Sequence, residues 1–286
     1  MGKWCALGVP VRSHTHHGGG DQMSSRDTPS PTARIVPRKA GCRRLPKPSQ
    51  EAFADPKLVL FQSFVCNTET ERGKRSNTIE LWDAVPKYCC SRKQMASLRV
   101  NGRFLPSMQR AFRHKDRGYL LRLYPAPILD FDAVERYYYP SAREELVEDA
   151  LRKLATKPGL GFHGETGGLP RSGVCFSLYL LRKELAARGH AITYADVKQS
   201  LLILARTEME IVDTSMGHTL ETWIISLTGV TREELKDDPN AKWYVDFNIL
   251  VSQAIVQRTY RQFDYARMMA HGTQLARWLH KRLAHN

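Results

Sequence analysis

The sequence has 286 residues, which is enough for two domains or one large one. It carries 43 Lys and Arg against 29 Asp and Glu, and this net charge of +14 favours a polyanionic partner, above all nucleic acid. No run of eighteen apolar residues occurs, so no membrane-spanning helix is expected, and residues 1–10 lack a signal-peptide pattern. The six cysteines form no C-x-x-C pair, which indicates reduced thiols in a cytoplasmic protein.

Residues 1–54 are predicted to form a disordered basic tail. The first 50 residues contain nine Lys and Arg but two Asp, several prolines and Gly18-Gly19-Gly20, with few large apolar residues. Half of the net charge therefore lies in this tail, where it raises non-specific affinity for DNA. Residues 55–140 are predicted to be a β-rich extension that adds strands to the domain that follows, because apolar runs at 58–61, 79–82 and 119–124 are separated by turn signals.

Residues 141–250 are predicted to form a winged helix-turn-helix domain. Its first helix begins with Ser141 and Glu144 at capping-box spacing and ends at Lys157-Pro158-Gly159, before a Gly-rich loop expected over residues 159–173. The next helix is expected over residues 174–187.

A left-handed turn at Gly189 separates that helix from a further one. Thr193 caps this second helix, which is expected to run to about residue 205 with Val197, Leu201 and Leu204 facing the core. Two helices joined by a tight turn that contains glycine make a helix-turn-helix.

The wing is expected from two alternating runs, residues 207–212 and 222–227, and residues 242–247 form a further strand. Residues 251–286 are predicted to be a linker and the first helix of an incomplete second winged helix. That helix is expected over residues 265–283, with one apolar and one basic face. The fold class expected is α+β: a winged helix-turn-helix domain with an N-terminal β-rich extension and a trailing amphipathic helix.

The second helix of a helix-turn-helix enters the major groove, so its exposed side and the cations near it are the candidate DNA contacts. The candidates are Arg182, Lys183, Arg188, His190, Thr193, Tyr194, Lys198, Gln199, Arg206, Arg258, Arg277, Lys281 and Arg282. The alternative is a solvated helical hairpin with no role in DNA binding, and spacing alone does not decide between the two. Leu202 and Ile203 adjoin core positions, so either they form a dimer interface or the core extends further round this helix.

No enzyme is predicted. The His14-Thr15-His16-His17 motif and Tyr137-Tyr138-Tyr139 would suit a metal-dependent replication nuclease, but the histidines lie in the tail rather than on a buried strand that orients them. Gly159-Leu160-Gly161 follows a helix, so it is no dinucleotide fingerprint, and neither a P-loop nor a Gly-x-Ser-x-Gly motif occurs. We therefore expect no catalytic residue, no metal and no cofactor.

Four blocks of sequence resemble the theta-type plasmid replication initiators, especially the RepA-like proteins of broad-host-range plasmids. The blocks are residues 77–88 (NTIELWDAVPKY), 138–151 (YYPSAREELVEDAL), 172–190 (SGVCFSLYLLRKELAARGH), and 259–265 (TYRQFDY) continuing into 273–281 (TQLARWLHK). The resemblance implies a pair of winged helices that bind repeated sites, called iterons, in double-stranded plasmid origin DNA. It implies that binding opens the neighbouring duplex and recruits host helicase and initiator proteins.

The resemblance also implies that the monomer initiates replication while a homodimer represses it, and that the first winged helix contacts the DNA backbone and forms the dimer interface. Members of the family continue past the helix that ends near Leu283, so by this resemblance the chain holds one full winged helix and a truncated second one. The alternative function is a winged-helix transcriptional regulator or autorepressor, which would bind an inverted repeat rather than tandem origin repeats.

Overall fold

The structure is a computed structural model that describes residues 70, 74–130, 132–228 and 241–284, all within one compact unit of residues 42–286. The predicted tail, the histidine motif at 14–17, the apolar run at 58–61 and all of residues 231–240 lie outside the described residues. In the part of the chain that the structure describes, no helix has the length and apolar character needed to cross a membrane.

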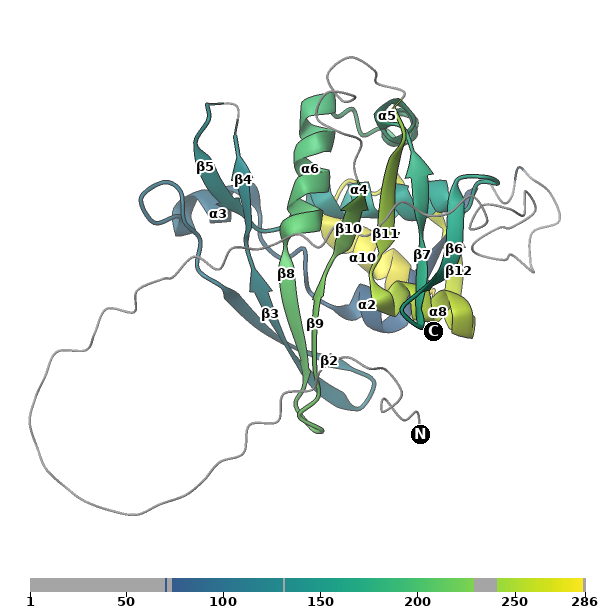
Figure 1. The fold of residues 1–286 in the computed structure, drawn as a ribbon, viewed down its shortest axis with the longest axis horizontal. Helices are drawn as coiled ribbons and strands as arrows, with labels where there is room; N and C mark the ends of the chain where they lie inside the picture. The colour runs from purple at the N-terminus through teal and green to yellow at the C-terminus, as the bar shows by residue number, and fades with distance from the viewer. Residues whose placement is uncertain (1–69, 71–73, 131, 229–240, 285–286) are drawn as a thin grey trace, which may run out of the picture. The chain divides into compact units, whose positions relative to one another are not determined.

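Helices and antiparallel strands mix along the described chain, as the predicted α+β class requires (Figure 1). The helices are α2 (Glu80–Ala84), α3 (Arg92–Leu98), α4 (Ala142–Ala155), α5 (Leu178–Ala186), α6 (Tyr194–Arg206), α8 (Ile249–Gln257), α9 (Tyr265–Met269) and α10 (Gln274–Leu283). The strands are β1 (Arg75–Ile79), β2 (Met108–His114), β3 (Arg117–Tyr124), β4 (Ala126–Leu129), β5 (Glu135–Tyr138), β6 (Gly161–Thr166), β7 (Leu169–Phe176), β8 (Glu208–Asp213), β9 (Thr219–Trp223), β10 (Ile225–Thr228), β11 (Trp243–Phe247) and β12 (Tyr260–Asp264).

The described strands form two four-stranded sheets and two strand pairs. One sheet has the order β10-β11-β7-β6 and the other the order β2-β3-β8-β9, while β1 pairs with β12 and β4 pairs with β5. Every pairing is antiparallel. Sequence-distant segments therefore meet in these sheets, and β11 lies beside β7 with Val245 opposite Val174.

The helix α4 lies at the centre of the described unit and is buried from Glu144 to Ala155. Its start follows the predicted capping box, because the backbone N–H of Ser141 donates to the Glu144 carboxylate at 2.9 Å. The apolar side chains of α4 belong to the core shared with β7, α5 and α6, and Figure 1 shows α4 passing behind β11 and β7. Its buried charged side chains form ion pairs with the other helices: Arg152 pairs with Asp83 of α2, and Glu145 pairs with Lys281 of α10.

The predicted Gly-rich loop at residues 159–173 is wrong, because β6 and β7 form a hairpin there. The strand β7 continues to Phe176, so α5 begins at Leu178 rather than at residue 174, after Ser177 caps it through the backbone N–H of Leu180. Gly173 lies inside the sheet, where a Cβ atom would come within 2.1 Å of the Val245 carbonyl oxygen. This glycine therefore permits close packing rather than a flexible loop.

The predicted extension supplies strands to the later part of the chain. The strand β3 pairs with β8, with Leu121 opposite Ile211, and β1 pairs with β12. The strand predicted at residues 79–82 is wrong beyond Ile79. The Asp83 carboxylate accepts hydrogen bonds at 2.7 Å from both the Ile79 backbone N–H and the Thr78 hydroxyl, which fixes the first turn of α2. The predicted boundaries at residues 140 and 250 stay predictions.

The helices α5 and α6 form the predicted helix-turn-helix pair. Gly189 has a φ of +85°, and the Thr193 hydroxyl accepts a hydrogen bond from the Asp196 backbone N–H at 3.1 Å. After α6 the strands β8 and β9 form a hairpin. The second strand predicted over residues 222–227 is wrong, because β9 ends at Trp223 and β10, from Ile225, pairs with β11 in the other sheet. Ile203 is completely buried, so its assignment to a dimer interface is wrong, and Leu202 is half-buried against the same core. The core therefore extends further round α6, which was the alternative.

The single helix predicted over residues 265–283 is two helices, because α9 ends at Met269 and α10 begins at Gln274 after the Thr273 cap. The apolar side chains Leu275, Trp278, Leu279 and Leu283 of α10 are exposed, whereas Arg277 and Lys281 are buried. The expectation of an exposed basic face on this helix is therefore wrong.

Candidate nucleic-acid interface

The side chain of Arg182 braces the turn between α5 and α6. Its Nε donates to the Ile192 carbonyl at 3.0 Å, and its guanidinium lies 4.7 Å from the ring centroid of Tyr194. These contacts join the last turns of α5 to the first residue of α6. The angle between the two helices is therefore held by a side chain that remains exposed and charged.

Exposed cations surround this turn. Arg182 and Lys183 are exposed on α5, and Lys198 is half-exposed on α6. The Lys183 ammonium lies 5.9 Å from the ring centroid of Tyr179, which is 48 % exposed. Tyr179 is not among the DNA contacts predicted from the sequence, because its spacing in this helix is that of an apolar position. The combination of cations with tyrosine side chains that donate hydrogen bonds suits contact with phosphates.

The opposite flank of α6 is already occupied by side-chain contacts. Arg143 donates to the Gln199 side chain at 2.7 Å, and the Gln199 amide donates to Asp130 at 3.0 Å. Arg143 also pairs with Asp196. Gln199 is therefore bonded within the protein, and the two carboxylates would repel a phosphate that approached from this side.

Arg188 and His190 point toward α9 rather than outward. Arg188 pairs with Glu184 at 3.3 Å, and its guanidinium lies 5.3 Å from the ring centroid of Tyr265. The Nε2 atom of His190 lies 3.0 Å from the carbonyl oxygen of Met269, to which it donates when it carries the proton. Both side chains fasten the helix-turn-helix to the later part of the fold.

The remaining predicted contacts lie apart from the turn. Arg206 is exposed at the end of α6, where it donates to the Pro127 carbonyl at 2.9 Å. Arg258 is exposed after α8, and Arg282 is half-exposed on α10. Thr193 is exposed, but its hydroxyl is used as the cap of α6. The structure thus gathers Arg182, Lys183, Tyr194 and Lys198 into one surface and leaves the other candidates outside it.

Arg277 and Lys281 lie inside the protein, each with 4 % exposure, which removes them from the candidate surface. The Lys281 ammonium lies 2.9 Å from Glu145 and 3.1 Å from Asp149, and Arg277 donates to the His271 carbonyl at 3.1 Å. Burial opposes the charge of Lys281, but Asp149 and Glu145 outweigh it and raise the pKa of the ammonium above its ordinary value.

A second buried cation, Arg152, extends this network toward α2. It pairs with Asp83 at 2.8 Å and with Asp149 at 2.9 Å. Burial alone would raise the pKa of Asp83, but Arg152 and Lys281 outweigh burial and hold that pKa well below its usual range. Glu148 accepts a hydrogen bond at 2.6 Å from the indole of Trp82 and another from the Tyr88 hydroxyl. The network thus fixes α2 and α10 on α4.

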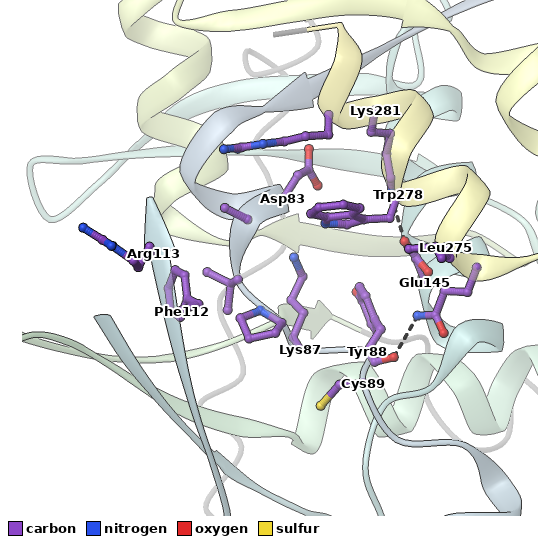
Figure 2. Close-up of a pocket in the computed structure, with 15 residues that line it drawn as sticks. Asp83, Lys87, Tyr88, Cys89, Phe112, Arg113, Glu145, Leu275, Trp278 and Lys281 are labelled. Atoms are coloured by element: carbon purple, nitrogen blue, oxygen red, sulfur yellow. Dashed lines mark hydrogen bonds and ion pairs between the residues drawn. The ribbon is translucent and has the colours of Figure 1, made fainter. Parts of the chain in front are cut away.

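An open groove lies between α10, the residues from α2 to α3, and β2 (Figure 2). Its volume is about 550 Å³. Trp278 lies over the groove in Figure 2, with Phe112 and Arg113 of β2 on the opposite side and Lys87 below. The Gln274 amide donates to the Tyr88 carbonyl at 2.7 Å and closes one end. Sequence analysis assigned no role to these residues.

The three consecutive tyrosines surround the end of β5, and two of them use their hydroxyls in the fold. The Tyr138 hydroxyl donates to Asp130 at 2.6 Å, and the Tyr139 hydroxyl donates to the Pro106 carbonyl. Burial raises the pKa of Tyr139 to about 12. No cluster of three or more His, Cys, Asp or Glu that could hold a metal occurs among the described residues.

No protein-family model matches this sequence, and no curated protein matches it either. One solved structure, of selenomethionine derivatives of domains 2 and 3 of RctB, aligns with 72 % of this chain and 71 % of that chain, with 10 % sequence identity and a TM-score of 0.42.

Proposed function

We propose that this chain is a RepA-like replication initiator that binds repeated sites in double-stranded plasmid origin DNA. In this proposal it acts in the cytoplasm, helps to open the duplex, recruits host helicase and initiator proteins, and catalyses no reaction. The observation that carries the proposal is the α5–α6 turn, with Arg182 and Lys183 exposed and Lys198 half-exposed around it. The net charge of +14 and the four blocks that resemble the initiator family support it.

In the proposed complex the N-terminal end of α6 enters the major groove, because Tyr194 and Lys198 lie on its accessible side. Arg182 and Lys183 then contact phosphates on the flank of that groove, and the brace at Ile192 sets the angle of entry. The β8–β9 hairpin serves as the wing. Its turn lies beside Arg117, which pairs with Asp213 at 3.6 Å and is available to a second stretch of backbone.

The proposal is tested by reversing two charges on the surface. We expect the double variant Lys183→Glu/Lys198→Glu to bind origin duplex at least about tenfold more weakly, because two contacts with phosphates are lost. The salt dependence of binding should also become shallower, because fewer counterions are released. The matched control is Lys93→Glu/Arg103→Glu, which reverses two exposed charges elsewhere and should change affinity by less than about twofold. Fluorescence anisotropy over a salt series measures both quantities. Equal losses in the two variants would contradict the assigned surface.

The same assay separates an initiator from a transcriptional regulator. Duplexes are compared that carry tandem direct repeats, one inverted repeat or a shuffled sequence. The proposal expects preference for the direct repeats, with successive sites filled by monomers, because direct repeats present the same face of the protein repeatedly. Preference for the inverted repeat, filled by a dimer, would favour the regulator instead.

A further inference from the structure

The outward face of α10 is apolar, although the helix lies on the surface. Leu275, Trp278, Leu279 and Leu283 are 66 %, 41 %, 43 % and 67 % exposed, and their spacing places them along one side of the helix. The helix cannot rotate to bury them, because Lys281 and Arg277 on its other side hold it against α4 and the α9–α10 turn. A contiguous apolar face of this kind marks an interaction site.

This apolar face continues into the groove of about 550 Å³. Leu275 and Trp278 of α10 line the groove on one side and Phe112 of β2 lines it on another (Figure 2). Val85 also lines the groove. The volume falls within the range of roughly 300–1,000 Å³ that is typical of binding pockets. The exposed apolar side chains of α10 therefore form a ridge beside the groove. A second helix can pack against such a surface by placing its side chains in the groove.

The charge around the groove is positive. The carboxylates that line it, Asp83 and Glu145, are already paired with Arg152 and Lys281. The lining arginines Arg113 and Arg282 form no ion pair with any residue that the structure describes. Neither α9 nor α10 contains an acidic residue. A partner that completes this surface must supply negative charge beside apolar side chains.

We propose that the outward face of α10 and this groove dock an acidic amphipathic helix from another protein. A second copy of the chain would bring its own Arg113 and Arg282 against the same arginines, and like charges repel. A nucleic acid would gain little from Leu275, Leu279 and Leu283, because leucine offers no ring on which a base can stack. A helix with leucines on one side and glutamates beside them matches both the apolar ridge and the two arginines.

Trp278 is the expected anchor of this interface. Large aromatic side chains at the centre of an interface carry much of its binding free energy. Trp278 lies between the exposed leucines of α10 and the groove, and it is 41 % exposed, so an incoming helix can cover it further. This docking site does not depend on DNA binding, since the α5–α6 surface lies on other elements.

The test uses the full chain and a fluorescent synthetic peptide of about five helical turns, with Leu at positions i, i+3 and i+7 and Glu on both flanks. One control peptide carries Lys in place of Glu, and another carries Ser in place of Leu. We expect the Glu–Leu peptide to bind with measurable affinity in an anisotropy titration and each control peptide to bind at least about tenfold more weakly. Binding of the Lys–Leu peptide with equal affinity would contradict the proposed charge complementarity.

Three variants of the chain test where the peptide binds. Trp278→Ala should weaken peptide binding by about tenfold or more, while Leu129→Ser, at a leucine of β4 that is 58 % exposed, should leave it unchanged. Arg113→Glu/Arg282→Glu should reverse the preference, so that the Lys–Leu peptide binds better than the Glu–Leu peptide. A general loss of folding cannot produce such a reversal. An unchanged preference would overturn the proposal.

Two other ligands of the α10 face, a second copy of the chain and a nucleic acid, would give different results. If sedimentation shows a dimer of the full chain that Trp278→Ala dissociates, a second copy occupies the face and the proposal fails. If a single-stranded oligothymidylate binds with the same dependence on Trp278 and the acidic peptide does not, the face is a nucleic-acid site and the proposal also fails. Trp278→Ala should leave origin duplex binding unchanged, so failure of peptide docking is distinguishable from failure of the proposed initiator function.

Discussion

The side chain of Lys281 decides which face of α10 packs on the protein. Glu145 and Asp149 of α4 lie within 2.9 and 3.1 Å of its ammonium. Burial raises the pKa of Asp149, while Lys281 and Arg152 oppose that rise. Leaving a buried carboxylate without its cation costs about 3–5 kcal/mol, so these pairs favour the orientation of α10 in which Lys281 is buried and the apolar stripe is exposed.

Replacing this lysine should therefore be costly. We expect Lys281→Met to lower the free energy of unfolding by about 3–5 kcal/mol, because Glu145 would remain buried without its cation and Asp149 would keep only Arg152. Urea denaturation followed by circular dichroism measures the change. Lys93→Met on the exposed surface of α3 is the matched control and should stay within about 0.5 kcal/mol of the wild type. A loss below about 1 kcal/mol in Lys281→Met would show that the network does not hold α10.

At the scale of single elements, the turn between α5 and α6 depends on one backbone conformation. Gly189 has a φ of +85°, and a Cβ atom there would meet no atom within 4 Å. Gly189→Ala should therefore lose about 1–2 kcal/mol of stability through backbone strain alone, since no contact is broken. Asparagine tolerates this conformation, so Gly189→Asn should lose less. Thermal unfolding measures both variants, with Gly272→Ala as a control at a glycine whose φ is not positive. Equal stability of the Ala and Asn variants would contradict strain as the cause.

Elements with local signals could be predicted from the sequence. The capping residues Ser141 and Thr193 marked the starts of α4 and α6, and the positive φ of Gly189 was expected from its place in the turn. Alternation of apolar residues marked β8. In each case the stabilising contact lies within a few residues along the chain, so a short stretch of sequence contains the information.

Elements that depend on distant partners were predicted incorrectly. The glycines of residues 159–173 indicated a loop, but β11 pairs with β7, and Gly173 permits the close approach of Phe162 and Val245. The amphipathic pattern of α10 was recognised, but Arg277 and Lys281 were wrongly expected to be exposed. The acidic side chains that bury Lys281 are supplied by α4, more than a hundred residues earlier, and no local pattern reveals them.

At the scale of the whole molecule, the distribution of positive charge predicts how the proposed DNA binding responds to salt. Half of the net charge of +14 lies in residues 1–50, where nine Lys and Arg occur with two Asp. The α5–α6 surface offers a few further cations, among them Arg182 and Lys183, whose positions the structure describes. Phosphate contacts from residues 1–50 and from the α5–α6 surface would both add affinity and salt dependence. Discrimination between DNA sequences also requires side chains that are held in position against the bases.

A chain that lacks residues 1–50 should therefore bind every duplex more weakly and with a shallower salt dependence, yet keep its preference among sequences. The slope of log affinity against log salt changes by about 0.9 for each phosphate contact that is lost. Anisotropy titrations of the full and shortened chains, with repeat-containing and shuffled duplexes over the same salt series, measure both quantities. The Lys183→Glu/Lys198→Glu variant should weaken the shortened chain as strongly as the full one. If the shortened chain bound neither duplex, the tail rather than the α5–α6 surface would be the DNA-binding site.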